Sequence, residues 1–287
     1  MSRREILSFD PAADFPASGG DAAGWPYSAA DFGRLDGSDD ARFYAEPKFV
    51  QHVDDRAVES LVEYYREEME EARVAKGGPP DVLDVCSSWT SHFPPATADA
   101  PTLGRVAGLG LNAAELQKND RLTERHVRDL NAPDGADLSD LFSDASFDVV
   151  AMSLSVDYLI RPLDVFRELA RVLRPGGRLL VTFSDRCFPT KAVAAWLSSD
   201  DVGRLAMVAT YLHVAVGEWE EIVAWDIKLP PLESPQRPGM RELMKDPALG
   251  LAWAAANAAA ARTRGGDPLY CVRGIKEEDG GGKLGRG

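Results

Sequence analysis

The sequence predicts an α/β fold, in which helices cover both faces of a doubly wound, mostly parallel, Rossmann-like sheet of seven strands. Two observations predict it. Between residues 82 and 183, short apolar runs alternate with stretches whose apolar residues recur at helical spacing. The first run, residues 82–86, is almost wholly apolar and lies between pairs of prolines, which is typical of a buried central strand.

A strong amphipathic helix is expected before the sheet, over residues 57–75, with apolar residues on one face and Glu and Arg on the other. Asp54 or Asp55 can cap its N-terminus, and Gly77 and the residues after it end it. The segment before it, residues 1–56, is expected to be an irregular N-terminal arm that either packs on the body or closes over the cleft as a lid.

The remaining elements follow in order along the chain. Strands are expected over residues 82–86, 105–111, 127–129, 147–152, 178–183, 221–229 and 269–276. Helices are expected over residues 113–119, 163–173, 190–199, 201–214 and 247–261. The last strand is interpreted as an antiparallel edge strand, and residues 57–276 are expected to form one domain. Residues 230–266 are expected to be an insertion before that strand, and residues 277–287 a disordered tail.

Composition excludes several classes of function. The net charge of -14 and the pI near 4.8 argue against binding of nucleic acid, which needs clustered Lys and Arg. No apolar run is long enough to span a membrane, and the first ten residues contain no apolar signal region. We expect a cytoplasmic location, or a plastid one if a transit peptide has been removed. The three cysteines form no CxxC pattern, so we expect no metal site and a reducing compartment.

The stretch DVLDVCSSWTSHFP, residues 81–94, is the expected position of the functional site. It joins the first buried strand to a turn of small polar residues. In open α/β sheets, ligands bind beside the carboxyl ends of the strands, so we place the cleft at this turn.

The order of five motifs is specific: the strand and turn at 81–88, GLGLN at 108–112, RDL at 128–130, FDVV at 147–150 and LRPGG at 173–177. Together they resemble the class I S-adenosylmethionine-dependent methyltransferases of the small-molecule, type 11 kind, over roughly residues 80–230 and the final strand. More narrowly, the chain resembles a plant, algal and bacterial subgroup with CSSW at the cofactor turn. The resemblance implies S-adenosylmethionine as cofactor and methyl transfer to a small molecule.

Two departures from the family pattern bear on cofactor binding. CSSW stands where the family has a Gly-rich loop, and Gly110 stands where it has an acid that grips the ribose hydroxyls. Small serines still permit close approach of the cofactor, Asn112 can bind the ribose instead, and Asp129 can bind the adenine amino group. The implied cofactor-binding residues are Asp84, Cys86, Ser87, Ser88, Trp89, Gly110, Leu111, Asn112, Asp129, Leu130 and Ser153.

Candidate catalytic residues lie near strand ends. Asp157 can accept a proton or hold a cationic substrate, Tyr158 can orient it, and His92 can act as a general base. Each also has a structural interpretation: Asp157 capping a turn, Tyr158 packed, and His92 holding its loop.

Three further side chains are candidates for contacts with the substrate. Tyr44 and His52 can face the cleft from the arm, and Arg186 can either pair with a substrate carboxylate or form a surface salt bridge. Cys187, beside it, is a nucleophile only if its pKa is lowered.

Three other functions remain open at this stage. A nicotinamide-dependent oxidoreductase would need GxGxxG directly after the first strand, which residues 87–92 lack. A catalytically inactive methyltransferase-like protein that binds or assembles with a partner fits the two departures. A different transfer from S-adenosylmethionine is the third alternative.

Overall fold

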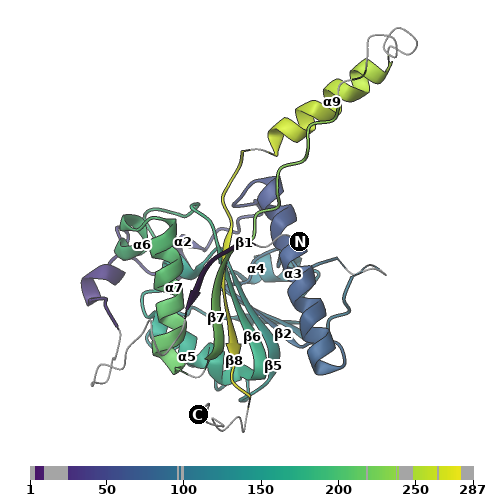
Figure 1. Ribbon diagram of the computed structural model, residues 1–287. Coiled ribbons are helices and arrows are strands. Elements are labelled where there is room, and N and C mark those ends of the chain that lie inside the picture. The colour runs from purple at the N-terminus through teal and green to yellow at the C-terminus, as the bar shows by residue number, and fades with distance from the viewer. Residues whose placement is uncertain are drawn as a thin grey trace, which may run out of the picture.

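The computed structural model describes residues 4–9, 25–95, 97, 100–217, 219–236, 238, 248–263 and 265–278. A central sheet of eight strands lies between two helical layers, with α3 and α4 on one face and α5 and α7 on the other (Figure 1). The strands are β1 (Arg4–Phe9), β2 (Val82–Val85), β3 (Val106–Gly110), β4 (Glu124–Val127), β5 (Phe147–Ser153), β6 (Leu173–Phe183), β7 (Trp219–Asp226) and β8 (Tyr270–Lys276). The helices are η1 (Ala29–Phe32), α2 (Asp40–Phe43), α3 (Asp55–Lys76), α4 (Ala113–Lys118), η2 (Val156–Tyr158), α5 (Pro162–Val172), α6 (Ala194–Ser198), α7 (Asp201–Val216) and α9 (Ala248–Arg262).

The predicted fold class is confirmed. The sheet order is β1-β7-β8-β6-β5-β2-β3-β4, and the five strands from β6 to β4 are parallel. From β2 the chain adds β3 and β4 on one side and then returns to add β5 and β6 on the other, so β2 stands at the switch point of the doubly wound sheet. The stretch expected to hold the functional site therefore begins at the centre of the parallel sheet.

Two predictions about the sheet are wrong. The sheet has eight strands rather than seven, because residues 4–9 of the arm pair antiparallel with β7 instead of being irregular. β8 is not an edge strand, because it lies between β6 and β7 and pairs antiparallel with both. In each case the strand's partner lies far away in the sequence, so no local pattern reports it.

The LRPGG motif, residues 173–177, directly follows the end of α5, and it already belongs to the next strand. β6 begins at Leu173, directly after α5, and its register against β5 jumps between Leu173 and Arg178. Gly176 lies in this irregular stretch with a φ of 71°, a left-handed conformation that glycine adopts without strain. The strand is therefore longer than predicted and starts with a bulge.

Helix α3 agrees closely with its predicted range. Asp54 caps it, since its Oδ1 accepts a hydrogen bond from the backbone N–H of Ala57 at 2.9 Å. Gly77 ends it in the left-handed conformation, with a φ of 73°. Leu61 and Met69 on its apolar face are fully buried in the core on that side of the sheet.

A long connection between β7 and β8 carries α9, which projects from the body beyond the edge of the sheet (Figure 1). The predicted helix is thus present in its expected place, and Trp253 ties it to the connection by donating to the carbonyl of Pro235 at 3.0 Å. Residues 239–247 and the predicted disordered tail from residue 279 lie outside the described residues. Among the described helices, none has both the length and the apolar character needed to cross a bilayer. The proposed domain boundaries stay predictions.

The strap, which we define as residues 34–53 of the N-terminal arm, crosses the carboxyl edge of the parallel strands. Its first half is held by a buried ionic cluster around Lys191, whose side chain is fully buried. The Lys191 ammonium lies 3.1 Å from Asp40 Oδ1 and donates to the carbonyl of Ser38 at 2.7 Å. Asp40 also accepts two hydrogen bonds from Arg34 Nη1, at 2.8 and 2.9 Å. This cluster fixes the strap to the loop before α6.

Replacing Lys191 with Met should lower the free energy of unfolding, because Asp40 and its neighbours would stay buried without their cation. Since Arg34 still pairs with Asp40, we expect a loss toward the lower end of the roughly 3–5 kcal/mol that removing one partner of a buried ion pair costs. Urea unfolding monitored by circular dichroism measures it. The exposed Lys118→Met is the matched control and should change stability by less than about 0.5 kcal/mol. Equal stabilities of the two variants would contradict the anchoring role.

Candidate active site

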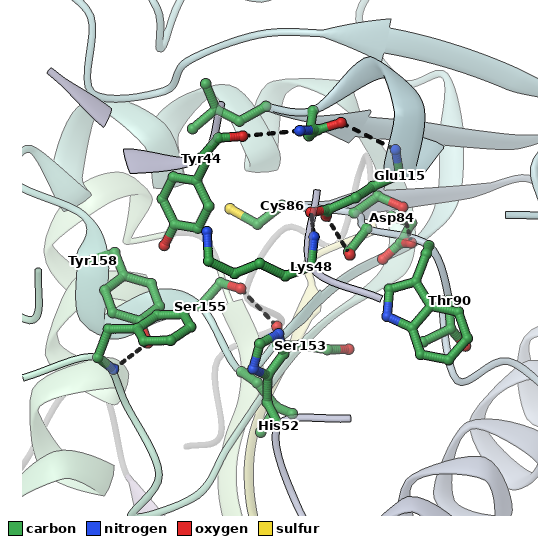
Figure 2. Close-up of a pocket in the computed structure, with 18 of the residues that line it drawn as sticks. Tyr44, Lys48, His52, Asp84, Cys86, Thr90, Glu115, Ser153, Ser155 and Tyr158 are labelled. Atoms are coloured by element: carbon green, nitrogen blue, oxygen red, sulfur yellow. Dashed lines mark hydrogen bonds between the residues drawn. The ribbon is translucent and has the colours of Figure 1, made fainter. Parts of the chain in front are cut away.

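A cavity of about 370 Å³ lies at the carboxyl ends of β2, β3, β5 and β6, beneath the strap. Its walls are the turn after β2, the loop from β3 into α4, the loops after β5 and β6, and residues 44–53 of the strap (Figure 2). The volume falls in the range of about 300–1,000 Å³ that is usual for small-molecule sites. The cavity is therefore where the position of the first strand predicted the cleft.

Most of the predicted site residues line this cavity. Those that do are Tyr44, His52, Asp84, Cys86, Ser87, Ser88, Trp89, His92, Gly110, Leu111, Asn112, Leu130, Ser153, Tyr158 and Arg186. Two do not: Asp129, whose Oδ1 accepts from the backbone N–H of Asn131, and Asp157. The structure brings these side chains together, and the individual roles assigned to them stay predictions.

The turn after β2 is pressed against the end of β3. The Ser87 N–H donates to the carbonyl of Leu109 at 2.8 Å, and Cys86 takes a left-handed φ of 57°. A Cβ atom at Gly110 would lie 2.1 Å from the Ser87 carbonyl oxygen, a distance that no side chain can tolerate. The two departures from the family pattern are thus one structural change, because this path of the turn requires glycine where the acid is expected.

Asp84 supports that turn from below. It is 2% exposed, and the Ser87 hydroxyl donates to its Oδ2 at 2.5 Å. Burial raises the pKa of Asp84 to about 7. Through this hydrogen bond, Asp84 stabilises the turn.

Asn112 is fully engaged in holding protein atoms. Its Oδ1 caps α4 by accepting from the N–H groups of Ala114 and Glu115, at 2.9 and 3.1 Å. Its Nδ2 donates to the strap carbonyls of Tyr44 and Ala45, at 2.9 and 3.2 Å. Because both ends of the amide are occupied in this way, Asn112 is poorly suited to the ribose contact predicted for it.

Glu115 is a cavity residue that sequence reasoning missed. Its Oε2 accepts from the Ser88 hydroxyl at 2.5 Å, and its Oε1 accepts from the backbone N–H of Lys48 at 2.7 Å. The pattern Asn112-x-x-Glu115 is typical of a capping box, which explains the side chain without any ligand. The carboxylate instead joins the turn after β2 to the strap. Trp89 adds a second tie by donating from Nε1 to the carbonyl of Val50 at 3.2 Å.

The opposite end of the cavity contains two neutral imidazoles. Burial lowers the pKa of both His52 and His92, that of His92 to about 4, so neither ring is protonated near neutral pH. The His52 ring lies edge-on to Phe188, with 5.5 Å between the ring centroids. Tyr158 positions the same loop, because its hydroxyl accepts from the N–H of Phe188 at 2.8 Å. Figure 2 shows His52 and Tyr158 on the side of the cavity away from Asp84 and Glu115.

Three predicted groups are placed less favourably for chemistry. Asp157 is 3% exposed, lies beside Tyr158 outside the cavity wall, and has a raised pKa of about 7 because it is buried. Burial also raises the pKa of Cys187, so its thiol lacks the activation that a nucleophile requires. Arg186 lines the mouth of the cavity and also forms the alternative salt bridge, donating from Nε to Asp267 at 2.6 Å.

Residues 83–181, about a third of the chain, match the family model described as a methyltransferase domain. A demethylmenaquinone methyltransferase from Listeria monocytogenes serotype 4a is 30% identical over 119 residues, which cover 41% of this chain and 49% of that protein. A 27-O-demethylrifamycin SV methyltransferase from Amycolatopsis mediterranei is 40% identical over 76 residues, covering 26% of this chain and 28% of that protein.

The chain therefore spans about half the length, or less, of these curated relatives. Among solved structures, the plantazolicin methyltransferase BamL is similar at a TM-score of 0.45 and 12% identity, over 78% of this chain and 87% of that one.

These matches support the predicted class for residues 83–181, which match the model of a methyltransferase domain. The resemblance implies S-adenosylmethionine as the cofactor of such a domain. The cavity fits that cofactor, since it lies at the strand ends where such ligands bind and the small residues Ser87, Ser88 and Gly110 line it. The narrower resemblance to a subgroup with CSSW stays a prediction.

Replacing Gly110 with Ala should destabilise the protein, because the Ser87 carbonyl is a backbone atom and cannot rotate away as a side chain would. We expect a loss of about 1–3 kcal/mol or more in the free energy of unfolding, as for other overpacked sites. The measurement is the midpoint of urea unfolding. Gly78→Ala is the control, since nothing lies within 4 Å of a Cβ there. If Gly110→Ala were as stable as the control, the close approach of turn and strand would be disproved.

The raised pKa of Asp84 predicts a dependence of stability on pH. Because the folded state holds this proton more tightly than the unfolded chain, the stabilisation is complete below pH 4 and is lost as the pH rises through about 7. Asp84→Asn removes the effect, so the variant should gain stability relative to wild type between pH 5 and pH 8. Chemical unfolding at both pH values measures this, with the exposed Asp120→Asn as control. A stability difference that is the same at both pH values would rule the effect out.

Proposed function

We propose that this protein transfers the methyl group of S-adenosylmethionine to a small-molecule acceptor. The observation that carries the proposal is one cavity with two chemically different ends, whose walls at β2, β3 and β5 lie in the segment that matches a methyltransferase domain. One end, at β2 and β3, offers backbone and hydroxyl groups for the cofactor. The other end, at β5 and β6, offers aromatic rings and neutral imidazoles for the acceptor.

At the cofactor end, we assign the amino acid part of the cofactor to the turn of Ser87 and Ser88 and the adenine to the apolar side chains of Leu111 and Leu130. All four residues line the cavity. Both serine hydroxyls already donate to carboxyl groups of the protein, so their lone pairs are left to accept from the amino group of the cofactor's amino acid part. Leu130 is the residue after Asp129, so the adenine assignment stays close to the one predicted from the sequence.

The bound cofactor supplies an electrophilic methyl group, which the acceptor attacks in line as the carbon–sulfur bond breaks and sulfur keeps the electron pair. The protein's main contribution is alignment, which can lower such a barrier by about 7–11 kcal/mol. An acceptor that carries a proton also needs a base. His92 is the best placed group for that task, because it lines the cavity and remains neutral at physiological pH.

The acceptor end is suited to a compact, partly aromatic molecule. Tyr44, Tyr158 and Phe188 contribute rings to the cavity wall, and His52 lies edge-on to one of them. The names of the relatives indicate small-molecule substrates for those proteins, a quinone precursor in one and a rifamycin precursor in another. These observations support a small-molecule acceptor here as well.

One observation favours the non-catalytic alternative, in which the domain binds a ligand or partner without chemistry. The strap is hydrogen-bonded across the cofactor end at Asn112, Glu115 and Trp89. A protein that never admits the cofactor could keep these bonds permanently. The alternative is therefore decided by whether the cofactor binds.

Isothermal titration calorimetry with S-adenosylmethionine and S-adenosylhomocysteine tests the proposal. We expect both ligands to bind, and a nicotinamide dinucleotide, the matched control with its own adenine and ribose, to give no heat. A screen of candidate acceptors by mass spectrometry should then find a product heavier by one CH₂. Absence of heat with both sulfur ligands would leave the non-catalytic alternative, and a product of any other mass would indicate a different transfer.

A further inference from the structure

The structure leaves open which group binds the ribose hydroxyls of the cofactor. The acid that the resemblance implies is absent, because the Ser87 carbonyl occupies the space that a Cβ at Gly110 would need. Asn112, the predicted replacement, has its amide engaged by α4 and the strap. A vicinal diol presents two donors, which a carboxylate with two free lone pairs accepts best.

Three carboxyl groups line the cavity among the described residues: Asp40, Asp84 and Glu115. Asp40 is already saturated, since it accepts from Arg34 and Asn131 and pairs with Lys191. Asp84 lies beneath the turn and is shielded by the Ser87 hydroxyl. Asp40 therefore has no free acceptor capacity, and Asp84, which is 2% exposed, is not accessible to a diol.

Glu115 has that capacity. It is 8% exposed, and each carboxylate oxygen accepts one hydrogen bond from a neutral donor, Ser88 Oγ on one and Lys48 N on the other. A carboxylate oxygen accepts two hydrogen bonds, so both oxygens keep a lone pair. No cation pairs with Glu115 among the salt bridges of the described residues. Figure 2 shows the side chain reaching into the cavity from the end that also holds Asp84 and Cys86.

We infer that Glu115 binds the ribose diol of the cofactor, in place of the acid that Gly110 cannot carry. The inference rests on the proposed function, because it assigns a contact of the same site. The carboxylate comes from the first turn of α4 rather than from the end of β3. Ser88 and Lys48 hold it in one orientation, as a binding group with few alternative rotamers requires.

The test compares two ligands that differ in a single ribose hydroxyl. Calorimetry measures binding of S-adenosylhomocysteine and of its 2′-deoxy analogue to wild type and to Glu115→Gln. We expect wild type to prefer the hydroxylated ligand by on the order of tenfold to a hundredfold, the effect of losing a hydrogen bond to a charged group. Glu115→Gln should lose most of that preference. Glu46→Gln, a Glu-to-Gln change at an exposed position of the strap, should keep it.

A purely structural role of Glu115, as a link between the turn and the strap, predicts a different result. It would weaken both ligands equally and leave their ratio unchanged, and this outcome overturns the inference. If Glu115→Gln does not fold, Glu115→Asp retains the charge with a shorter reach and should also lose the preference.

The outcomes separate this inference from the proposed function. If wild type binds neither ligand, the proposed function fails and the inference fails with it. If wild type binds both ligands equally well, or if Glu115→Gln keeps the wild-type preference, the cofactor site stands and only the assignment of Glu115 is wrong.

Discussion

The contact between the Ser87 carbonyl and the bare backbone of Gly110 determines the shape of this site. A turn of small polar residues follows β2, and it can lie against β3 only because residue 110 has no side chain. The turn then places the Ser88 hydroxyl 2.5 Å from Glu115 and the Ser87 hydroxyl 2.5 Å from Asp84. The CSSW turn and the glycine at position 110, which look independent in the sequence, are therefore linked through one backbone path.

Local sequence patterns were sufficient to predict the fold class and most elements. Helix α3 shows a clear apolar period with an N-cap at Asp54 and a stop at Gly77, and each of these signals acts within a few residues. The pairing of β1 with β7 and the interior position of β8 could not be predicted in the same way. Both depend on hydrogen bonds between segments that are distant in the chain, and a strand pattern does not specify its partner.

The location of the site was predictable for a physical reason, and its chemistry was less so. Strand ends meet at one edge of a parallel sheet, so residues following β2, β3 and β5 were expected to converge. Glu115 was hidden because a glutamate three residues after an N-cap has a sufficient structural explanation. Asp157 was misleading for the opposite reason, because a carboxyl just after a strand can turn away from the cleft into the protein interior, as it does here.

The strap is held by unlike interactions at its two ends, and this difference bears on access to the cavity. Around Lys191 it is held by buried charges, whose separation is costly because each would remain desolvated. Over the cofactor end it is held by single hydrogen bonds at Asn112, Glu115 and Trp89, each worth only about 0.5–1.5 kcal/mol in net terms, or somewhat more where the carboxylate of Glu115 is the acceptor. The strap is therefore held more weakly over the cavity than around Lys191. The Glu115 carboxylate accepts from the Lys48 N–H at the weaker end of the strap, and it also keeps acceptor capacity toward the cavity. A ligand that bonds to Glu115 would therefore act on the weaker end of the strap.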